Sequence, residues 1–256
     1  MATPELGAPE SEEAQQGLFA HLLELRSRLL RAVATVVLVL VALVPFANRL
    51  YSELAEPLVA RMPQGAHMIA TEVTSPFLTP LKLAFYVALF VSMPMILYQL
   101  WAFVSPGLYR HEKRLARPLL AAALVLFYLG GAFAYFLVLP AAFHFLIAVT
   151  PQGVEMMTDI THYLDFVMLM FFAFGLCFEV PVAVVILAAV GVVDLAKLRS
   201  GRRYAVVGAF AIAAMITPPD ITSMMMLGIP MCLLYELGIL AVSWLIKPGD
   251  AKSETG

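Results

Sequence analysis

Two acidic residues stand alone among basic residues in the polar segments of this chain. Glu24 lies in "FAHLLELRSRLLRA", and Glu112 lies in "WAFVSPGLYRHEKRLARP". A carboxylate in such a setting either pairs with a neighbouring base or accepts hydrogen bonds from a cation of another molecule. On a helix, Glu24 and Arg28 form an i,i+4 pair worth about 0.3–0.5 kcal/mol. Composition alone favours this local pair.

Two further acids lie inside apolar runs. Glu179 lies in "FGLCFEVPVAV", two residues before Pro181, and Glu236 lies in "LLYELGIL". A charge near the bilayer centre costs at least about 2.5–3.5 kcal/mol, so such residues are functional candidates. Pro181 should kink its helix and free a backbone carbonyl. Each carboxyl is either protonated or hydrogen-bonded to a neighbouring helix, or part of a polar docking or proton-linked site.

The sequence contains no constellation of catalytic residues. It lacks HExxH, GxSxG, a Walker loop and paired intramembrane aspartates, so we expect no enzyme, no metal and no cofactor. Cys177 and Cys232 have no neighbouring Cys or His at ligand spacing. We interpret both as small buried hydrophobic residues.

The elements that must hold these acids are membrane helices. Hydrophobic residues make up 62% of the chain and charged residues 13%, and the mean hydropathy is +0.89. Soluble domains are about half apolar and a quarter charged, so the sequence predicts an all-α integral membrane protein. A span needs about 20 apolar residues. Six candidates are Arg31–Asn48, Leu83–Phe103, Pro118–Leu139, Phe166–Val193, Tyr204–Thr217 and Met224–Ile246.

The fifth of these spans is too short for a bilayer of ordinary thickness. Pro218 and Pro219 end it, because neither has an amide hydrogen and each disfavours helical backbone in the preceding residue. Local thinning of the bilayer or snorkelling side chains accommodate a short span. The first span is also short for a membrane helix, but it is longer than the roughly 7–15 apolar residues of a cleavable signal peptide. It also follows a polar segment and lacks a small-x-small cleavage site, so we expect it to be retained.

The basic residues orient the six spans. Thirteen of the sixteen fall on one side, leaving Arg49, Arg61 and Lys82 on the other. By the positive-inside rule the basic side is cytoplasmic and both termini lie there. We expect a polar disordered tail over 1–17, a membrane domain over 18–246 and a second cytoplasmic tail over 247–256.

Two outer segments are expected to form caps. Residues 49–82 contain four prolines interleaved with apolar residues, which predicts short helices over the outer membrane surface, and "VTPQGVEMMTDITHYLDF" forms a second cap. No internal repeat is visible, so the inverted-repeat architecture of many transporters has no support.

Long strings in the chain resemble one protein family. These are "HLLELRSRLL", "LYQLWAFVSPGLYRHEKR", "FYLGGAFAYFLVLP", "FGLCFEVPVA" and "TPPD". Together they resemble the TatC family, the multispanning subunit of the twin-arginine protein translocase, from about residue 18 to about residue 246. The resemblance implies six transmembrane helices in a concave cup, large periplasmic caps, and short fifth and sixth helices.

The resemblance also implies a binding site for the twin-arginine signal peptides of folded precursor proteins. The matching positions are Glu24, Arg26, Phe103, Arg110 and Glu112. The planar fork of arginine pairs bidentately with a carboxylate, whereas lysine presents a point charge. Two carboxylates can therefore select an arginine pair, and the flanking bases repel generic cationic segments.

Partner helices are implied on the wall formed by the fifth and sixth spans. Family members dock the single-span proteins TatA and TatB there, at positions that match Glu179, Ala214, Met215 and Thr217, while Pro57 and Asp220 match structural positions of the outer cap. The resemblance implies a self-associating protein of the cytoplasmic (inner) membrane that works by the proton-motive force and binds no nucleic acid.

Two other classes of function remain as alternatives. A proton-coupled small-solute transporter would use Glu179, but the chain lacks repeats and several converging intramembrane polar residues. An intramembrane enzyme would need a nucleophile paired with a base, and the sequence shows no motif that contains such a pair. The sequence therefore favours a receptor and scaffold of protein export.

Overall fold

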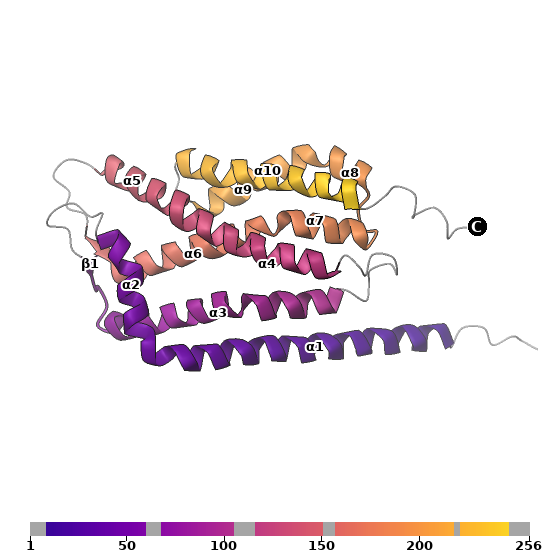
Figure 1. The fold of residues 1–256 in the computed structure, drawn as a ribbon, viewed down its shortest axis with the longest axis horizontal. Helices are drawn as coiled ribbons and strands as arrows, with labels where there is room; N and C mark the ends of the chain where they lie inside the picture. The colour runs from indigo at the N-terminus through magenta and orange to yellow at the C-terminus, as the bar shows by residue number, and fades with distance from the viewer. Residues whose placement is uncertain (1–8, 60–67, 105–115, 151–156, 218–220, 246–256) are drawn as a thin grey trace, which may run out of the picture.

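The computed structural model describes residues 9–59, 68–104, 116–150, 157–217 and 221–245, and helices dominate this part of the chain (Figure 1). Five helical segments in it are long and apolar enough to cross a membrane. In chain order the elements are α1 (Pro9–Leu43), η1 (Val44–Phe46), α2 (Ala47–Val59), β1 (Met68–Ile69), α3 (Ser75–Val104), α4 (Ala116–Phe133), η4 (Ala134–Val138), α5 (Leu139–Val149), β2 (Thr158–Asp159), α6 (Ile160–Phe178), α7 (Val180–Ala189), α8 (Leu195–Ser200), α9 (Arg202–Ile216) and α10 (Ile221–Leu245).

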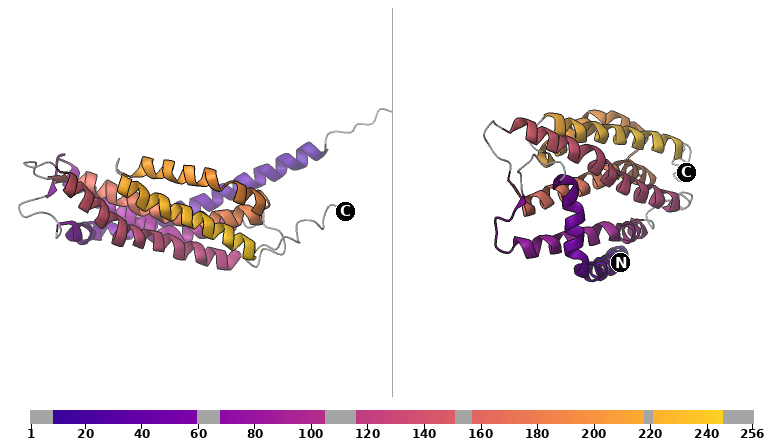
Figure 2. Two further views of the ribbon diagram at one scale, coloured as in Figure 1. Left: turned by 90° about the horizontal axis from the view of Figure 1, so that it is seen from above. Right: turned by 60° about the vertical axis from the view of Figure 1, so that its left-hand side comes forward.

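The long helices run side by side along the length of the molecule (Figure 1). Helix α1 packs on α3, α4 packs on α6, and α10 packs on both α7 and α9, so α1 and α9 lie on opposite sides of the bundle (Figure 2). We call the end where α1 begins and α10 ends the termini end. The opposite end, which carries α2, β1 and β2, is the cap end.

The helices follow the predicted spans with differences in length. Helix α1 begins at Pro9, within the segment assigned to a polar tail. The third span continues past Leu139 as one helix through the π-helical section η4 to the end of α5. Helix α9 has only 15 residues, as the prolines predict. Helix α10 has 25 residues. This length agrees with the sixth span expected from hydropathy and is greater than that of the short sixth helix that the resemblance implies.

Proline residues account for the main interruptions. Pro45 is the second residue of the 3₁₀ turn η1, where the chain leaves α1 and turns into α2 across the cap end (Figure 1). Pro94 lies inside α3 and cannot donate to the carbonyl of Phe90. The hydroxyl of Tyr128 on α4 donates to that carbonyl at 3.1 Å. The bond links two spans and satisfies an acceptor that would otherwise be costly in lipid.

Helices α4 and α6 approach so closely that only glycine fits between them. A Cβ on Gly130 would lie 2.5 Å from the carbonyl oxygen of Phe174, and one on Gly175 would lie 2.7 Å from the ring of Phe127. Small residues of this kind let membrane helices bring their backbones together. This crossing holds α6, and with it Glu179, against the centre of the bundle.

The core consists of two hydrophobic clusters. The first lies toward the cap end and contains Phe174, Phe178 and Leu227 among others. The second lies toward the termini end and contains Phe127, Trp101 and Val182. The junction of α6 and α7 therefore lies between the two clusters, because Phe178 precedes it and Val182 follows it.

Two segments at the cap end meet as the expected caps. Met68 and Ile69 pair in parallel with Thr158 and Asp159, residues about 90 positions later in the chain. Helix α2 packs on α3 and crosses the end of the bundle (Figure 1). The cap is thus anchored to the starts of both α3 and α6.

Replacing the glycine at the α4–α6 crossing should destabilise the protein. We expect Gly130→Ala to cost about 1–3 kcal/mol, since its Cβ meets a backbone atom that cannot rotate away. Gly208→Ala on α9 is the matched control: no atom lies within 4 Å of its Cβ, and alanine favours helix by up to about 1 kcal/mol. Thermal unfolding in detergent measures both variants. Equal unfolding temperatures would contradict the close approach.

Candidate functional site

Glu24 contacts an arginine on its own helix. Its Oε1 accepts from Nε of Arg28 at 3.0 Å and also from Nη2 of the same guanidinium. Both bonds reach one oxygen, and among the described residues Oε2 has no partner. The local i,i+4 pair favoured by composition is therefore present, and half of the carboxylate is left to bind a second donor.

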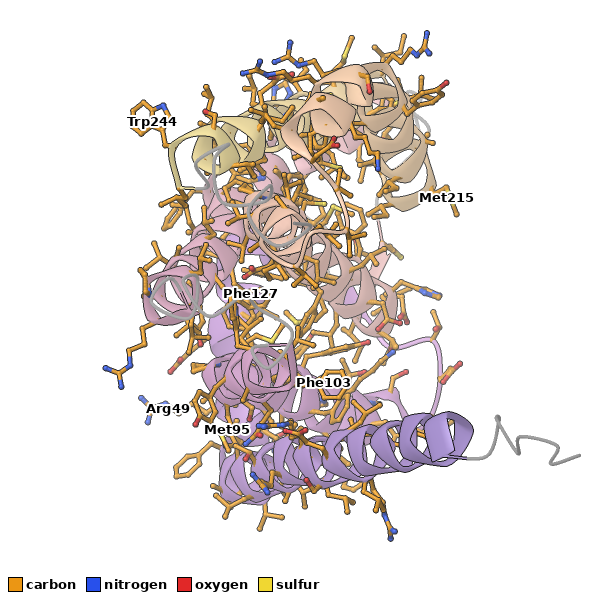
Figure 3. All side chains as sticks on the ribbon, turned by 90° about the vertical axis from the view of Figure 1, so that its right-hand side faces the viewer. Arg49, Met95, Phe103, Phe127, Met215 and Trp244 are labelled. Carbon is orange, nitrogen blue, oxygen red and sulfur yellow. The ribbon has the colours of Figure 1, made fainter. Side chains whose placement is uncertain are left out.

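The other described members of the predicted signal-peptide site lie at the same end of the bundle. Arg26 is exposed on α1, and Phe103 is half-buried at the end of α3 (Figure 3). Helices α1 and α3 pack side by side, so these residues lie on two neighbouring helices. Arg110 and Glu112 lie outside the described residues.

Glu179 occupies the junction of α6 and α7. Its carbonyl oxygen accepts the first bond of α7, from the amide of Ala183 at 2.9 Å, and Pro181 interrupts the ladder as predicted. The side chain is half-buried, and its Oε1 is buried with no hydrogen-bond partner in the described part of the chain. An unsatisfied carboxyl oxygen at membrane depth is costly. The junction is thus a polar point that a further donor would stabilise.

The predicted docking residues lie at the cap end of α9. Met215 is 86% exposed and points away from the bundle (Figure 3), and Ala214 is exposed beside it. Thr217 is buried, and its hydroxyl donates to the carbonyl of Ala213 at 2.8 Å. Thr217 therefore closes the helix, whereas Met215 presents a surface. Asp220 lies outside the described residues.

Pro57 lies in the last turns of α2, and its backbone continues that helix. The position agrees with a place in the outer cap. The structural role that the resemblance implies for Pro57 stays a prediction.

Glu236 has a partner that the sequence did not reveal. Its Oε2 accepts from Nη2 of Arg202 at 2.8 Å, and the pair joins α10 to the start of α9. The adjacent Tyr235 donates to the carbonyl of Leu198 on α8 at 3.0 Å. These bonds tie the short helices α8 and α9 to α10. Glu236 is thus bonded to a neighbouring helix, the more conservative of its two interpretations.

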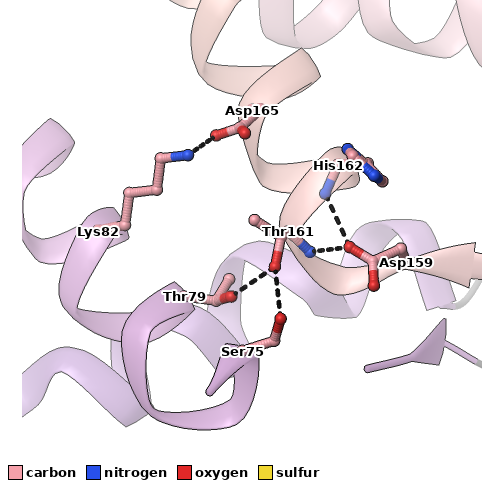
Figure 4. Close-up of polar contacts among 7 residues, drawn as sticks. All are labelled: Ser75, Thr79, Lys82, Asp159, Thr161, His162 and Asp165. Atoms are coloured by element: carbon pink, nitrogen blue, oxygen red, sulfur yellow. Dashed lines mark hydrogen bonds and ion pairs between the residues drawn. The ribbon is translucent and has the colours of Figure 1, made fainter. Parts of the chain in front are cut away.

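A polar cluster at the cap end joins the two caps (Figure 4). The hydroxyl of Thr161 donates to Ser75 at 3.1 Å and bonds Thr79 at 3.0 Å. One turn further on, Lys82 of α3 forms an ion pair with Asp165 of α6. Each bond joins the first turns of α3 to the first turns of α6.

Asp159 is the most strongly bonded member of this region. It caps α6 by accepting from the amides of Thr161 at 2.8 Å and His162 at 3.1 Å. Its other oxygen accepts from Thr71, from the hydroxyl at 2.7 Å and from the amide at 2.9 Å. These bonds, with the Thr71 hydroxyl contributing most, hold the pKa of Asp159 well below its ordinary value.

Some of these residues had a signal in the sequence. Asp159 stands directly before a long apolar run, which is the position of a helix N-cap. Lys82 and Asp165 had none, because their pairing depends on which helices become neighbours. Cys177 and Cys232 are free. The described residues contain no group of three or more His, Cys, Asp or Glu that could hold a metal ion.

Comparisons with known proteins agree with this architecture. The family model for Sec-independent protein translocase protein (TatC) matches residues 20–230. The chain is 54% identical over 231 residues to the TatC protein of Azotobacter chroococcum, covering 90% of both chains. It is 49% identical to that of Escherichia coli K12, covering 95% of both. A crystal structure of a twin-arginine translocase receptor, TatC, superposes with a TM-score of 0.76 at 35% identity, covering 88% of this chain and 99% of the other.

Acid should unfold the cap through Asp159. A depressed carboxyl pKa contributes stability that is complete above about pH 4 and is lost as pH falls toward the folded-state pKa. We expect Asp159→Asn to lower stability at pH 7 by about 1–3 kcal/mol, as for hydrogen bonds to a charged group, and to flatten the pH dependence below pH 4. Thr71→Val should give part of the same effect. Thermal unfolding in detergent from pH 3 to pH 7 is the measurement, and superimposable profiles for wild type and Asp159→Asn would contradict this role.

Proposed function

Because the chain belongs to the TatC family of Sec-independent protein translocase proteins, we propose that it is the receptor and scaffold subunit of a twin-arginine translocase. In this role it binds the twin-arginine signal peptides of folded precursors at the termini end. It also assembles TatA- and TatB-type single-span proteins along α9 and α10. It is a membrane protein and not an enzyme, so the proton-motive force supplies the work of export.

The Glu24–Arg28 contact is the observation that carries this proposal. The carboxylate of Glu24 accepts two bonds from one guanidinium, both at Oε1. A carboxylate with both oxygens available can accept the bidentate pair that arginine offers and lysine does not. The Glu24–Arg28 pair is local and only partly buried, so it contributes little stability and can be exchanged. An arginine of a signal peptide can bind the remaining oxygen of Glu24 or displace Arg28.

The distribution of basic residues supports a cytoplasmic termini end. The described bases at that end are Arg26, Arg28, Arg31, Arg117, Lys197, Arg199, Arg202 and Arg203, whereas Arg49 and Lys82 lie toward the cap end. Such asymmetry orients membrane proteins with the basic side in the cytoplasm. We therefore assign the protein to the cytoplasmic (inner) membrane with both termini inside.

Glu179 and Met215 support a docking wall for partner helices. The exposed Met215 continues an apolar surface of α9 that includes Val207 and Ile212. Methionine adapts to differently shaped helix faces. A partner that brings a hydrogen-bond donor to Glu179 removes the cost of its unsatisfied Oε1.

Loss of the Glu24 carboxylate should weaken signal-peptide binding. A hydrogen bond to a charged group is worth about 1.5–3 kcal/mol, so we expect Glu24→Gln to lower affinity about tenfold to a hundredfold and to reduce the preference for an arginine pair over a lysine pair. Glu112→Ala should abolish binding. Asp194→Asn is the control, because this exposed carboxylate caps α8 at the same end and Asn caps helices as well as Asp. Peptide binding to the purified protein measures the three variants against wild type.

A charge exchange separates recognition from local stability. The double variant with Glu24→Arg and Arg28→Glu restores an i,i+4 pair but moves the carboxylate. If it bound twin-arginine peptides as wild type does, Glu24 would act only through Arg28, and its proposed recognition role would be wrong.

Substitutions at Glu179 distinguish partner docking from proton-coupled transport. Glu179→Gln keeps an acceptor without a titratable proton, so we expect it to retain copurified single-span partners, while Glu179→Ala should lower their yield about tenfold. A photoreactive residue at Met215 should crosslink to those partners, and one at Leu38, which is 71% exposed on α1, should not. Equal loss of partners in both Glu179 variants, with loss of a proton-coupled solute flux, would favour the transporter instead.

A further inference from the structure

An apolar cavity lies under α2 near the cap end. Its volume is about 340 Å³, and it lies between α2, α3, η4 and α6, partly open to the surface. Its lining residues are Leu50, Glu53, Leu54, Leu83, Tyr86, Val87, Phe90, Tyr135, Met168, Phe171 and Phe172. Glu53 is the only charged residue among them, and Tyr86 and Tyr135 are the only other residues with polar side-chain groups. The lining is therefore predominantly apolar.

The cavity lies at the depth of the hydrocarbon in the leaflet at the cap end. Val87, Phe90 and Phe171 belong to helices that cross the membrane, while α2 crosses the end of the bundle above them (Figure 1). Leu50 and Leu54 lie one turn apart on α2 and face the cavity. A helix with this pattern lies in the membrane interface with its apolar face inward.

The polar side of α2 carries a pair of opposite charges at the mouth of the cavity. Arg49 Nε donates to Glu53 Oε1 at 3.0 Å, and the two side chains are 79% and 62% exposed. So exposed a pair contributes little stability and is easily opened. Interfacial side chains of this kind lie at the level of the lipid headgroups.

We propose that this site binds a phospholipid with an amine-bearing, zwitterionic headgroup, phosphatidylethanolamine, with one acyl chain in the cavity, its phosphate on Arg49 and its ammonium on Glu53. The guanidinium fork suits phosphate oxygens, and the carboxylate one turn later suits the ammonium. The apolar cavity accounts for the chain and the ion pair for the headgroup. The site rests on the membrane location of the protein and is independent of signal-peptide binding.

The position of the cavity favours a lipid as its occupant. The cavity lies beneath α2, and most of its lining belongs to helices long and apolar enough to cross the membrane. An acyl chain is a single file of methylene groups and fits a narrow apolar space. The lipids of the surrounding leaflet supply that chain at high local concentration.

Filling the cavity should displace the lipid. We expect Val87→Trp to lower the amount of phosphatidylethanolamine retained through detergent purification at least tenfold, as measured by native mass spectrometry. Val91→Trp is the matched control: it lies one turn along α3, is 53% exposed and does not line the cavity. Val87→Phe fills less space and keeps the test open if the tryptophan variant fails to fold. Equal retention by the folded Val87 and Val91 variants would overturn the proposal.

The headgroup contacts have their own test. In nanodiscs containing equal amounts of phosphatidylethanolamine and phosphatidylglycerol, wild type should retain the former at least fivefold more. Arg49→Gln should lower retention of both lipids, and Glu53→Gln should abolish the preference. Both side chains are exposed, so neither change threatens the fold. Equal retention of the two lipids by wild type would refute the headgroup assignment.

A photoreactive residue at Val87 tests the other possible occupants. Irradiation of native membranes should give an adduct with the mass of a phospholipid. A covalent dimer of this chain, or an adduct with a single-span protein or a signal peptide, would show that a protein segment fills the cavity and would overturn the proposal.

Discussion

The absence of water in the bilayer core is the constraint on which this structure depends. Every backbone carbonyl in that region must be bonded within the protein, so each interruption of a helix requires a compensating group. Where Pro94 frees the carbonyl of Phe90, Tyr128 supplies the donor. Where Pro181 interrupts the fourth long helical segment, Glu179 brings a carboxyl whose Oε1 has no bond within the described chain. At Pro94 the protein itself bonds the freed carbonyl. Beside Pro181, Oε1 of Glu179 is left for a donor from a partner.

The same constraint divides the chemistry between the two ends. At the cap end, Asp159 and Thr161 join the caps through partly buried hydrogen bonds that need no other molecule. At the termini end, Glu24 is held by a single local partner on a helix that is mostly exposed along its length. A carboxylate fixed by several neighbours is a structural element, whereas one held by a flexible arginine can exchange partners. This contrast in bonding separates the cap end from the termini end, where we propose that the signal peptide binds.

Local features were predictable from the sequence, and contacts between helices were not. Hydropathy predicted the spans, proline predicted the break beside Glu179, and i,i+4 spacing predicted the Glu24–Arg28 bond, because each effect acts within a few residues. The pairs Lys82–Asp165 and Arg202–Glu236 depend on which helices become neighbours. No local pattern contains that information. Helix α1 begins at Pro9, within the segment that composition assigned to a polar tail.

The short α9 gives a physical reason for the proposed docking of a partner helix beside it. Fifteen residues span only about 22 Å of a hydrocarbon core roughly 30 Å thick, while the neighbouring α10 is long enough to cross it. The bilayer must thin beside α9, at a cost that grows with each ångström of mismatch. A partner helix on this wall shields the step from lipid and lowers that cost. Met215 lies in the last turn of α9, next to the thinned bilayer, and faces outward. Pro218 and Pro219 make α9 short by ending it. The resulting mismatch therefore favours association with a partner helix at Met215, whose side chain is exposed.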